Sequence, residues 1–327
     1  MALDLTLATS ITAASIILAA IILGLGRAFG YKRIEQFGIE ELFQCIVNAA
    51  IIGGIVGITA AVTEISSGFG LSSCTGTVIE QFSCSMQTTN ASLFSLFQSL
   101  LNLTSLLGYY GSLSLNFGSF NIMPFGNLTN MSNLFGIHML VTNLLMIAIS
   151  VNEQMAKFIA EQAFNGLLTI GLTFRAFFAT RKIGGFVLAL AIGLYIFYPS
   201  FVLIFPSPLT EINNATVNIT AVTTNSYYAP LPVVDLNNNN ALAEKIDVMS
   251  GRCSGAGAPN PTNCPTGTTN FTSDLTIAAQ NTTSALAKTS LYAFVAPLFS
   301  LILTIIFVKE LANLLGGEIG FRTLSNV

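Results

Sequence analysis

The stretch Ile183–Phe205, IGGFVLALAIGLYIFYPSFVLIF, decides the class of this protein because it contains no charged side chain. An α-helix needs about 20 apolar residues to cross the hydrocarbon core of a bilayer. Across all 327 residues, charged side chains make up 8% and hydrophobic ones 52%. A soluble domain carries roughly 25% charged residues. The composition therefore predicts an integral membrane protein and excludes an ordinary soluble domain.

Four other segments have the length and composition of a membrane span: Ala8–Gly26, Phe43–Ile65, Leu134–Val151 and Ser290–Val308. Together with Ile183–Phe205 they predict an all-α membrane protein with about five transmembrane helices. A sixth apolar stretch, Ala91–Tyr110, carries a glycosylation sequon at Asn102 in its middle. Because a glycan cannot lie in hydrocarbon, we interpret this stretch as an amphipathic helix on the outer surface.

The basic residues orient these spans. Nine of the twelve fall between the first and second spans, between the third and fourth, or after the fifth: Arg27, Lys32, Arg33, Lys157, Arg175, Arg181, Lys182, Lys309 and Arg322. The positive-inside rule then predicts an outside N-terminus and an inside C-terminus. A cleaved signal peptide is the competing interpretation, but Asp4 and the lack of a basic residue before the first apolar run favour an uncleaved anchor.

Glycosylation and oxidation signals give the same orientation. Both occur outside the cytoplasm, and they gather in two loops predicted to be extracellular. The sequons are at Asn90, Asn102, Asn127, Asn130, Asn214, Asn218, Asn270 and Asn281. Cys74 and Cys84 lie in the first loop, and Cys253 and Cys264 in the second. Pairing within each loop is the simplest disulfide arrangement and cross-loop pairing the alternative. Cys45 is expected to be a buried thiol.

The predicted organisation has five parts. Residues 1–65 hold two spans with a short basic cytoplasmic loop, and residues 66–133 form the first extracellular loop with its amphipathic helix. Residues 134–205 hold spans three and four around a cytoplasmic helical segment, 152–182. Residues 206–288 form the second extracellular loop, where turns and irregular structure should dominate because Asn, Thr, Pro and Gly are abundant. Residues 289–327 hold the fifth span and a cytoplasmic tail.

Two rows of small residues at i+4 spacing are candidate helix-packing sites: Ala49, Gly53, Gly57 and Ala61 in the second span, and Gly185, Ala189 and Gly193 in the fourth. Small residues let helix backbones approach closely in lipid. The rows indicate either an oligomer interface or packing within one subunit. Arg175, Arg181 and Lys182 are candidates for binding a cytoplasmic partner such as an ATPase, or for contacting lipid phosphate.

No catalytic constellation can be assembled from the chain. His138 is the only histidine, and a lone histidine is typical of a hydrogen-bonded packing residue. No Ser-His-Asp set or phosphate-binding loop is found, and zinc is disfavoured because no histidine accompanies the loop cysteines. The sequence thus predicts a protein that is not an enzyme and has no cofactor or metal.

Two segments carry a family resemblance: Gly171–Pro199, GLTFRAFFATRKIGGFVLALAIGLYIFYP, and Val308–Gly320, VKELANLLGGEIG. They resemble archaeal polytopic membrane proteins of the CedA type, the membrane component of crenarchaeal DNA-exchange systems. That component is similar in turn to the polytopic inner-membrane subunit of type IV secretion systems. The resemblance implies a symmetric oligomer at the base of a pilus or DNA conduit. Its partners would be a cytoplasmic ATPase and a pilin-like protein.

The leading functional expectation is therefore a glycosylated archaeal cell-membrane protein that forms a homo-oligomeric platform or channel for DNA exchange. Two other hypotheses remain open at this point. One is a structural envelope glycoprotein that forms a lattice or anchors a surface layer. The other is an oligomeric channel for ions or small solutes.

Overall fold

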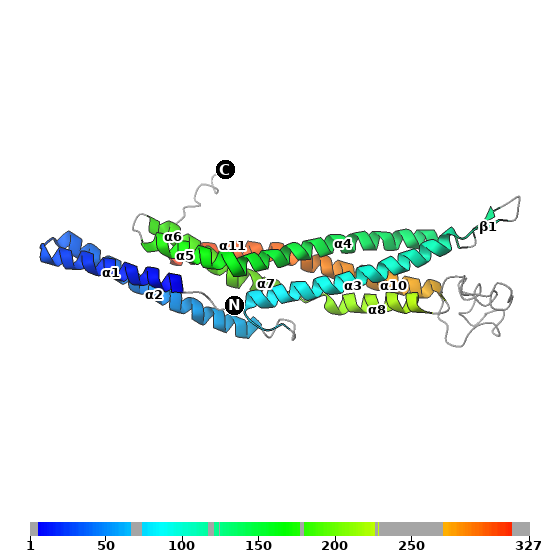
Figure 1. Cartoon of the computed structure of the whole chain (residues 1–327), viewed down its shortest axis with the longest axis horizontal. Coiled ribbons are helices and arrows are strands. Elements are labelled where there is room, and N and C mark those ends of the chain that lie inside the picture. Colours follow the sequence, from blue (N-terminus) through cyan, green and yellow to red (C-terminus); the bar gives the residue numbers. More distant parts are fainter. Residues whose placement is uncertain are drawn as a thin grey trace. The chain divides into compact units, whose positions relative to one another are not determined.

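The computed structural model describes residues 6–66, 74–116, 121–123, 125–176, 180–225, 228 and 271–315 (Figure 1). These residues fall into two compact units. Unit 1 comprises Met1–Met86, Val151–Pro206 and Val295–Val327, and unit 2 comprises Gln87–Ser150 and Ser207–Phe294. The boundaries between them do not coincide with the five parts expected from the sequence. Each unit is described by itself.

The predicted all-α fold is confirmed. The helices are α1 (Thr6–Ala28), α2 (Lys32–Ser66), α3 (Val78–Ser112), α4 (Leu128–Phe158), α5 (Phe164–Ala176), α6 (Arg181–Ile192), α7 (Tyr198–Leu203), α8 (Leu209–Thr224), α10 (Phe271–Ser290) and α11 (Ala296–Leu314). Three π-helical turns join some of them: η1 (Ile159–Ala163), η3 (Gly193–Phe197) and η7 (Leu291–Val295). Two-residue strands β1 (Leu115–Asn116) and β2 (Asn121–Ile122) pair antiparallel between α3 and α4.

Within the described residues, six helical stretches are long and apolar enough to cross a membrane: Thr9–Ala28, Lys32–Gly54, Val78–Ser112, Leu128–Arg175, Arg181–Leu203 and Phe271–Leu314. Five of them overlap the predicted spans, so the structure is that of a multi-pass membrane protein. The additional stretch is α3, which includes the apolar segment that we placed outside the membrane on the sequence alone. It extends well beyond that segment toward the N-terminus.

Unit 1 contains two helical hairpins in which glycines permit close contact near the turn. In the first, Gly30 takes a positive φ of 67° between α1 and α2, a conformation that glycine adopts without steric cost. A Cβ on Gly26 would lie 2.6 Å from the Glu35 nitrogen, and one on Gly38 would lie 2.8 Å from the Leu23 Cα. The α1 and α2 backbones therefore pack at a distance that only glycine allows.

The second hairpin, α5–α6, is closed in the same way. A Cβ on Gly184 would lie 2.5 Å from the Arg175 nitrogen and 2.6 Å from the Gly171 oxygen. The hydroxyl of Thr180 donates to the Phe174 carbonyl across the turn, at 2.7 Å. Helix α11 packs against both α6 and α7. Gly171 and Gly184 thus bring α5 and α6 into close contact.

The described part of unit 2 is a four-helix bundle in which α3, α4, α10 and α8 form a closed ring of neighbours. At least one hydrogen bond or ion pair joins each adjacent pair: Ser132 to Thr104, Thr283 with His138, Lys288 to Glu211, and Ser99 with Thr220. Along α3, buried apolar residues recur every three or four positions at Leu93, Leu96, Leu100, Leu103, Leu107 and Tyr110. The apolar face of α3 is therefore used for packing within the bundle.

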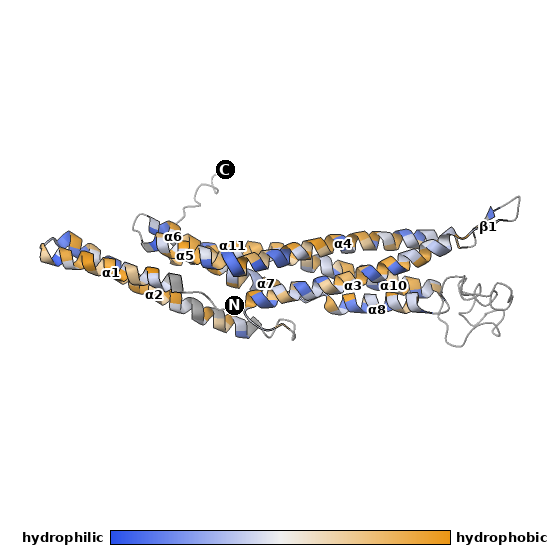
Figure 2. Cartoon of the chain, viewed as in Figure 1, coloured by the Kyte–Doolittle hydropathy of each residue, from blue (hydrophilic) through white to orange (hydrophobic). Residues whose placement is uncertain are grey.

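The expectation that irregular structure dominates residues 206–288 is wrong for the part that the structure describes. Helices α8 and α10 occupy Leu209–Thr224 and Phe271–Ser290. Their sequences are rich in Thr and Asn, and Figure 2 shows hydrophilic residues on both helices. The buried positions nevertheless follow helical spacing, as at Ile212, Ala215 and Ile219. Burial of this narrow apolar stripe outweighs the weak helix propensity of the polar residues.

The disulfide expected within the first loop is present, between Cys74 and Cys84. The second pair of loop cysteines, Cys253 and Cys264, lies outside the described residues, as does the sequon at Asn270. Cys45 is buried on α2 and is not disulfide-bonded, as we predicted. The Cys74–Cys84 bond ties the segment that precedes α3 to the first turns of that helix.

Candidate functional site

The two rows of small residues have different surroundings. In the α6 row, a Cβ on Gly193 would overlap the Val308 side chain, and Ala189 is fully buried in a cluster with Val308. This row therefore packs on α11 within the same chain. In the α2 row all four members are exposed, and a Cβ on Gly53 or Gly57 would have nothing within 4 Å. Only the α2 row leaves a close-packing surface open for another helix.

Arg175 is not exposed to solvent. It lies on the last turn of α5, is 5% exposed, and donates from Nη1 to the Leu315 carbonyl at 2.9 Å. Leu315 is the residue that caps the C-terminus of α11. A cation at that end satisfies a free carbonyl and interacts favourably with the negative end of the helix dipole. The structure thus gives Arg175 an intramolecular role that joins α5 to α11.

Arg181, the first residue of α6, also has a partner within the chain. Its Nη2 lies 2.5 Å from Oε1 of Glu41 on α2, and both side chains are largely buried. With Arg175 these residues form what we call the polar clamp: Glu41, Arg175 and Arg181. It links α2, α5, α6 and α11. We predicted that Arg175, Arg181 and Lys182 bind a cytoplasmic partner or lipid phosphate. Of these three, only Lys182 is exposed.

A pocket of about 390 Å³ with a mainly apolar lining lies beside the polar clamp, between α1, α2 and α5. Its lining includes Glu41, Gln44, Asn48, Thr173 and Arg175. The Oδ1 atom of Asn48 and the Nε atom of Arg175 are buried and have no hydrogen-bond partner among the described residues. An unsatisfied buried polar group costs about 1–3 kcal/mol. The two atoms therefore add a cost to the fold that the hydrogen bonds of the described residues do not offset.

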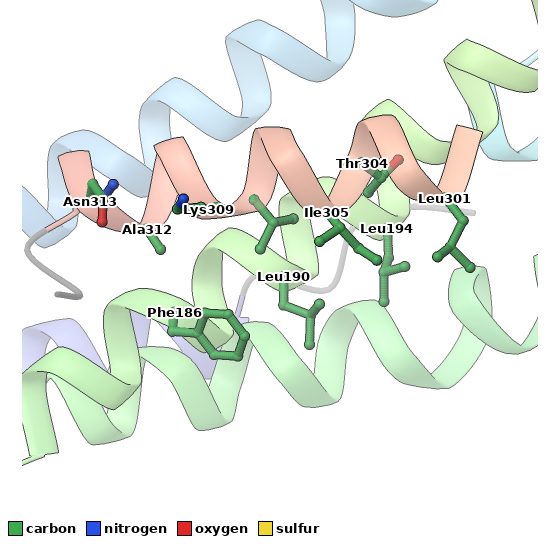
Figure 3. Close-up of a pocket in the computed structure, with 10 residues that line it drawn as sticks. Phe186, Leu190, Leu194, Leu301, Thr304, Ile305, Lys309, Ala312 and Asn313 are labelled. Carbon is green, nitrogen blue, oxygen red and sulfur yellow. The ribbon is translucent and has the colours of Figure 1, made fainter. Parts of the chain in front are cut away.

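A second, apolar groove of about 350 Å³ runs between α6, η3 and α11 (Figure 3). Leu190 and Leu194 form one wall, and Leu301 and Ile305 the other. Lys309 is the one charged side chain in its lining. We did not predict this groove from the sequence. The sequence signal for it is the i+4 spacing of its lining residues on the fourth and fifth predicted spans.

The sequons that the structure describes all lie in unit 2. Four have an exposed asparagine, at Asn102, Asn127, Asn130 and Asn214, and three have a half-buried one, at Asn90, Asn218 and Asn281. Two neighbouring contacts involve α4. Asn90 donates from Nδ2 to the Ser150 hydroxyl at 3.1 Å, and Thr283 of the Asn281 sequon lies 3.2 Å from His138 Nε2. His138 is 7% exposed, so it is the hydrogen-bonded packing residue that we predicted.

One face of α4 in unit 2 is apolar and exposed. We call it the α4 stripe; its members are Leu134, Ile137, Leu140, Leu144 and Ile147, with exposures from 37% to 61%. The opposite face of the same helix carries the buried His138 and Thr142. An apolar stripe of this length on the outside of a folded unit is typical of a surface that contacts lipid or another protein.

Among the residues that the structure describes, no group of three His, Cys, Asp or Glu side chains lies close enough to hold a metal ion. Comparison of the chain with protein-family models, curated proteins and solved structures gives no match. The open α2 row, the polar clamp with its pocket, and the apolar groove are therefore the features from which a function must be argued.

Proposed function

We propose that this protein is a homo-oligomeric membrane platform, in which unit 1 spans the bilayer and unit 2 stands on the outer side. The observation that carries the proposal is the open α2 row. A Cβ on Gly53 or Gly57 would meet no atom of another helix within 4 Å, whereas the equivalent row on α6 is filled by α11. In lipid, where apolar surface alone does not drive helix association, a small-residue row of this kind supports close contact with a second helix.

The placement of unit 2 outside rests on the distribution of charges and sequons. All eight sequons fall within the residues of unit 2, and nine of the twelve basic residues fall within those of unit 1. Exposed positions on α8 and α10 are mainly polar, including Asn213, Asn214, Thr276 and Gln280. A surface of this kind suits water and disfavours hydrocarbon.

Because this placement puts Leu134–Val151 outside the bilayer, the third membrane crossing is a different segment from the one that we predicted from the sequence. Glycans on Asn90 and Asn281 would hold the two ends of the segment Leu134–Val151 outside the hydrocarbon, because Asn90 donates to Ser150 and Thr283 of the Asn281 sequon contacts His138. The crossing would then use the next stretch, Ile159–Arg175. Its length of about 17 residues is at the short end of the range for a membrane helix. The chain keeps five crossings, an outside N-terminus and an inside C-terminus.

In this setting the α4 stripe lies outside the bilayer and needs an apolar partner. A second copy of the chain supplies one, since each copy carries the same stripe, and the contact in unit 2 would add to that of the α2 row. Self-association through two surfaces is what a platform requires. The proposal requires no catalytic group in the α2 row or in the α4 stripe.

The assembly is tested with Gly53→Leu and the matched control Gly24→Leu. Both glycines are exposed on membrane helices and have no neighbour within 4 Å, but only Gly53 belongs to the α2 row. We expect Gly53→Leu to lower the oligomer mass measured by light scattering in detergent, and Gly24→Leu to leave it unchanged. A wild-type monomer, or a Gly53→Leu variant with the wild-type mass, would refute the proposal.

The topology has its own test. Cysteines are introduced one at a time into a background in which Cys45, Cys253 and Cys264 are replaced by Ser, which leaves the disulfide-bonded Cys74 and Cys84 as the native cysteines, and intact cells are treated with a membrane-impermeant maleimide. Asn143→Cys, in the middle of Leu134–Val151 and next to the α4 stripe, is expected to be labelled, as is Val217→Cys on α8. Ile305→Cys on α11 should stay unlabelled. If Asn143→Cys behaves like Ile305→Cys, then Leu134–Val151 crosses the membrane and the proposed shift is wrong.

The kind of assembly is proposed from the resemblance of Gly171–Pro199 to the membrane component of DNA-exchange systems. A cytoplasmic ATPase would then bind the inner turns of unit 1, where Lys32, Arg33 and Lys182 are exposed. Charge reversal, with Lys32→Glu and Lys182→Glu together, is expected to abolish co-purification of an ATPase with the tagged protein. Absence of any ATPase in the wild-type preparation would count against the DNA-exchange role and leave the platform itself untouched.

A further inference from the structure

We propose that the groove between α6, η3 and α11 binds one hydrocarbon chain of an anionic membrane lipid, with Lys309 pairing with its phosphate. The site is separate from both proposed oligomer surfaces. Its walls are two rows at i+4 spacing, Phe186–Leu190–Leu194 on one side and Leu301–Ile305–Lys309–Asn313 on the other. Figure 3 shows these side chains along the two neighbouring helical segments.

The groove forms because α6 and η3 pack closely on α11 through small residues, while the larger side chains beside that contact stay apart. Gly193 and Ala189 bring α6 and η3 against Val308 of α11. Leu190 and Ile305 then stand on either side of the line of contact and leave a channel between them. The exposure of Ile305, at 59%, opens the channel to the surroundings of unit 1.

The dimensions select a single chain. The row from Leu301 to Asn313 extends over about 18 Å at the rise of an α-helix. A cavity volume of about 350 Å³ spread over that length describes a narrow channel. An α-helix with its side chains has a diameter of about 10 Å, so a helix from another protein is too wide. One polymethylene or isoprenoid chain is narrow enough.

The positive charge of Lys309 determines which lipid headgroup the groove prefers. Lys309 lies toward the end of the groove where α11 approaches its C-terminus, and among the described residues it makes no ion pair. Its stem lies along the apolar wall, so its ammonium can extend to the membrane surface. A lysine near the surface contributes about 1 kcal/mol to binding of an anionic lipid, which corresponds to about a five-fold preference over a zwitterionic one.

The test uses native mass spectrometry of protein exchanged into an equimolar mixture of phosphatidylglycerol and phosphatidylcholine with identical chains. We expect the wild type to retain one lipid per chain and to favour phosphatidylglycerol about five-fold. Lys309→Gln should retain a lipid without headgroup preference. Lys32→Gln, which removes an exposed lysine from the start of α2, should behave as the wild type.

A second pair of variants tests the groove itself. Ile305→Trp fills it and should abolish retention. Ile302→Trp makes the same change at an equally exposed position of α11 that does not line the groove, and should retain the lipid. Equal retention of the two lipids by the wild type, or equal loss in both tryptophan variants, would overturn the proposal. Because lipids are counted per chain, the result is independent of whether the protein assembles.

Discussion

The close approach of α5 and α6 predicts a large effect from adding a single methyl group at Gly184. A Cβ at this position would lie 2.5 Å from the Arg175 nitrogen, 2.6 Å from the Gly171 oxygen and 2.9 Å from the Arg175 Cα. All three are backbone atoms, which cannot rotate away. Ordinary contact begins near 3.4 Å, so the helices must separate locally by about 0.9 Å. Overpacking of this kind costs about 1–3 kcal/mol.

The separation would also disturb the polar clamp, because Arg175 reaches the Leu315 carbonyl at 2.9 Å and an added 0.9 Å exceeds hydrogen-bond distance. For a unit of this size, each kcal/mol corresponds to about 2–4 °C in Tm. We therefore expect Gly184→Ala to lower the Tm of the purified protein by about 2–12 °C, measured by circular dichroism in detergent.

The matched control is Gly166→Ala on the same hairpin. Gly166 lies in α5, is exposed, and has nothing within 4 Å of the position of a Cβ. Alanine there should leave the Tm unchanged or raise it, because glycine in a helix is less favourable than alanine by roughly 0.5–1 kcal/mol. A Gly184→Ala variant as stable as Gly166→Ala would refute the close packing of α5 and α6.

Three further changes have defined outcomes. Glu41→Gln removes the charge that faces Arg181 and should cost about 1.5–3 kcal/mol of unfolding free energy in denaturant titration; an additive double-mutant cycle would contradict the pairing. The hydrogen bond from Lys288 lowers the pKa of Glu211, so this pair stabilises unit 2 above the unfolded pKa of about 4.3, and the contribution is lost as pH falls through the lower folded value. Glu211→Gln should accordingly flatten the dependence of Tm on pH between about 5 and 3, and an unchanged slope would exclude the pair. Peptide mapping should find a lower glycan occupancy at Asn90, whose amide donates to a serine on α4, than at the exposed sequons; full occupancy at Asn90 would show that this hydrogen bond is not maintained.

Much of the fold could be predicted because membrane helices are decided by local composition. The apolar stretch Ile183–Phe205 almost coincides with the observed Arg181–Leu203. The sequence did not predict α8 and α10, because their many Thr and Asn residues are typical of turns. There the few apolar positions, such as Ile219, become significant only once neighbouring helices bury them.

The candidate site was only partly predictable, for a related reason. The two small-residue rows are alike in sequence, and spacing cannot tell that Gly193 meets Val308 while Gly53 meets nothing. Arg175 likewise reads as a basic residue at the membrane surface, but it donates to the end of a helix 140 positions away in the chain. Partners at such separations depend on how hairpins pack, which no local pattern contains.

The sequence by itself determined that this is a helical, multi-pass membrane protein and where its apolar segments lie, because the cost of placing polar groups in hydrocarbon acts residue by residue. Only the tertiary structure decided which faces of those helices are used within the chain. It filled the α6 row with α11, left the α2 row open, and formed a groove with Lys309 in its lining. Those outcomes depend on pairwise packing and close contact between distant residues, and they exist only once the helices have come together.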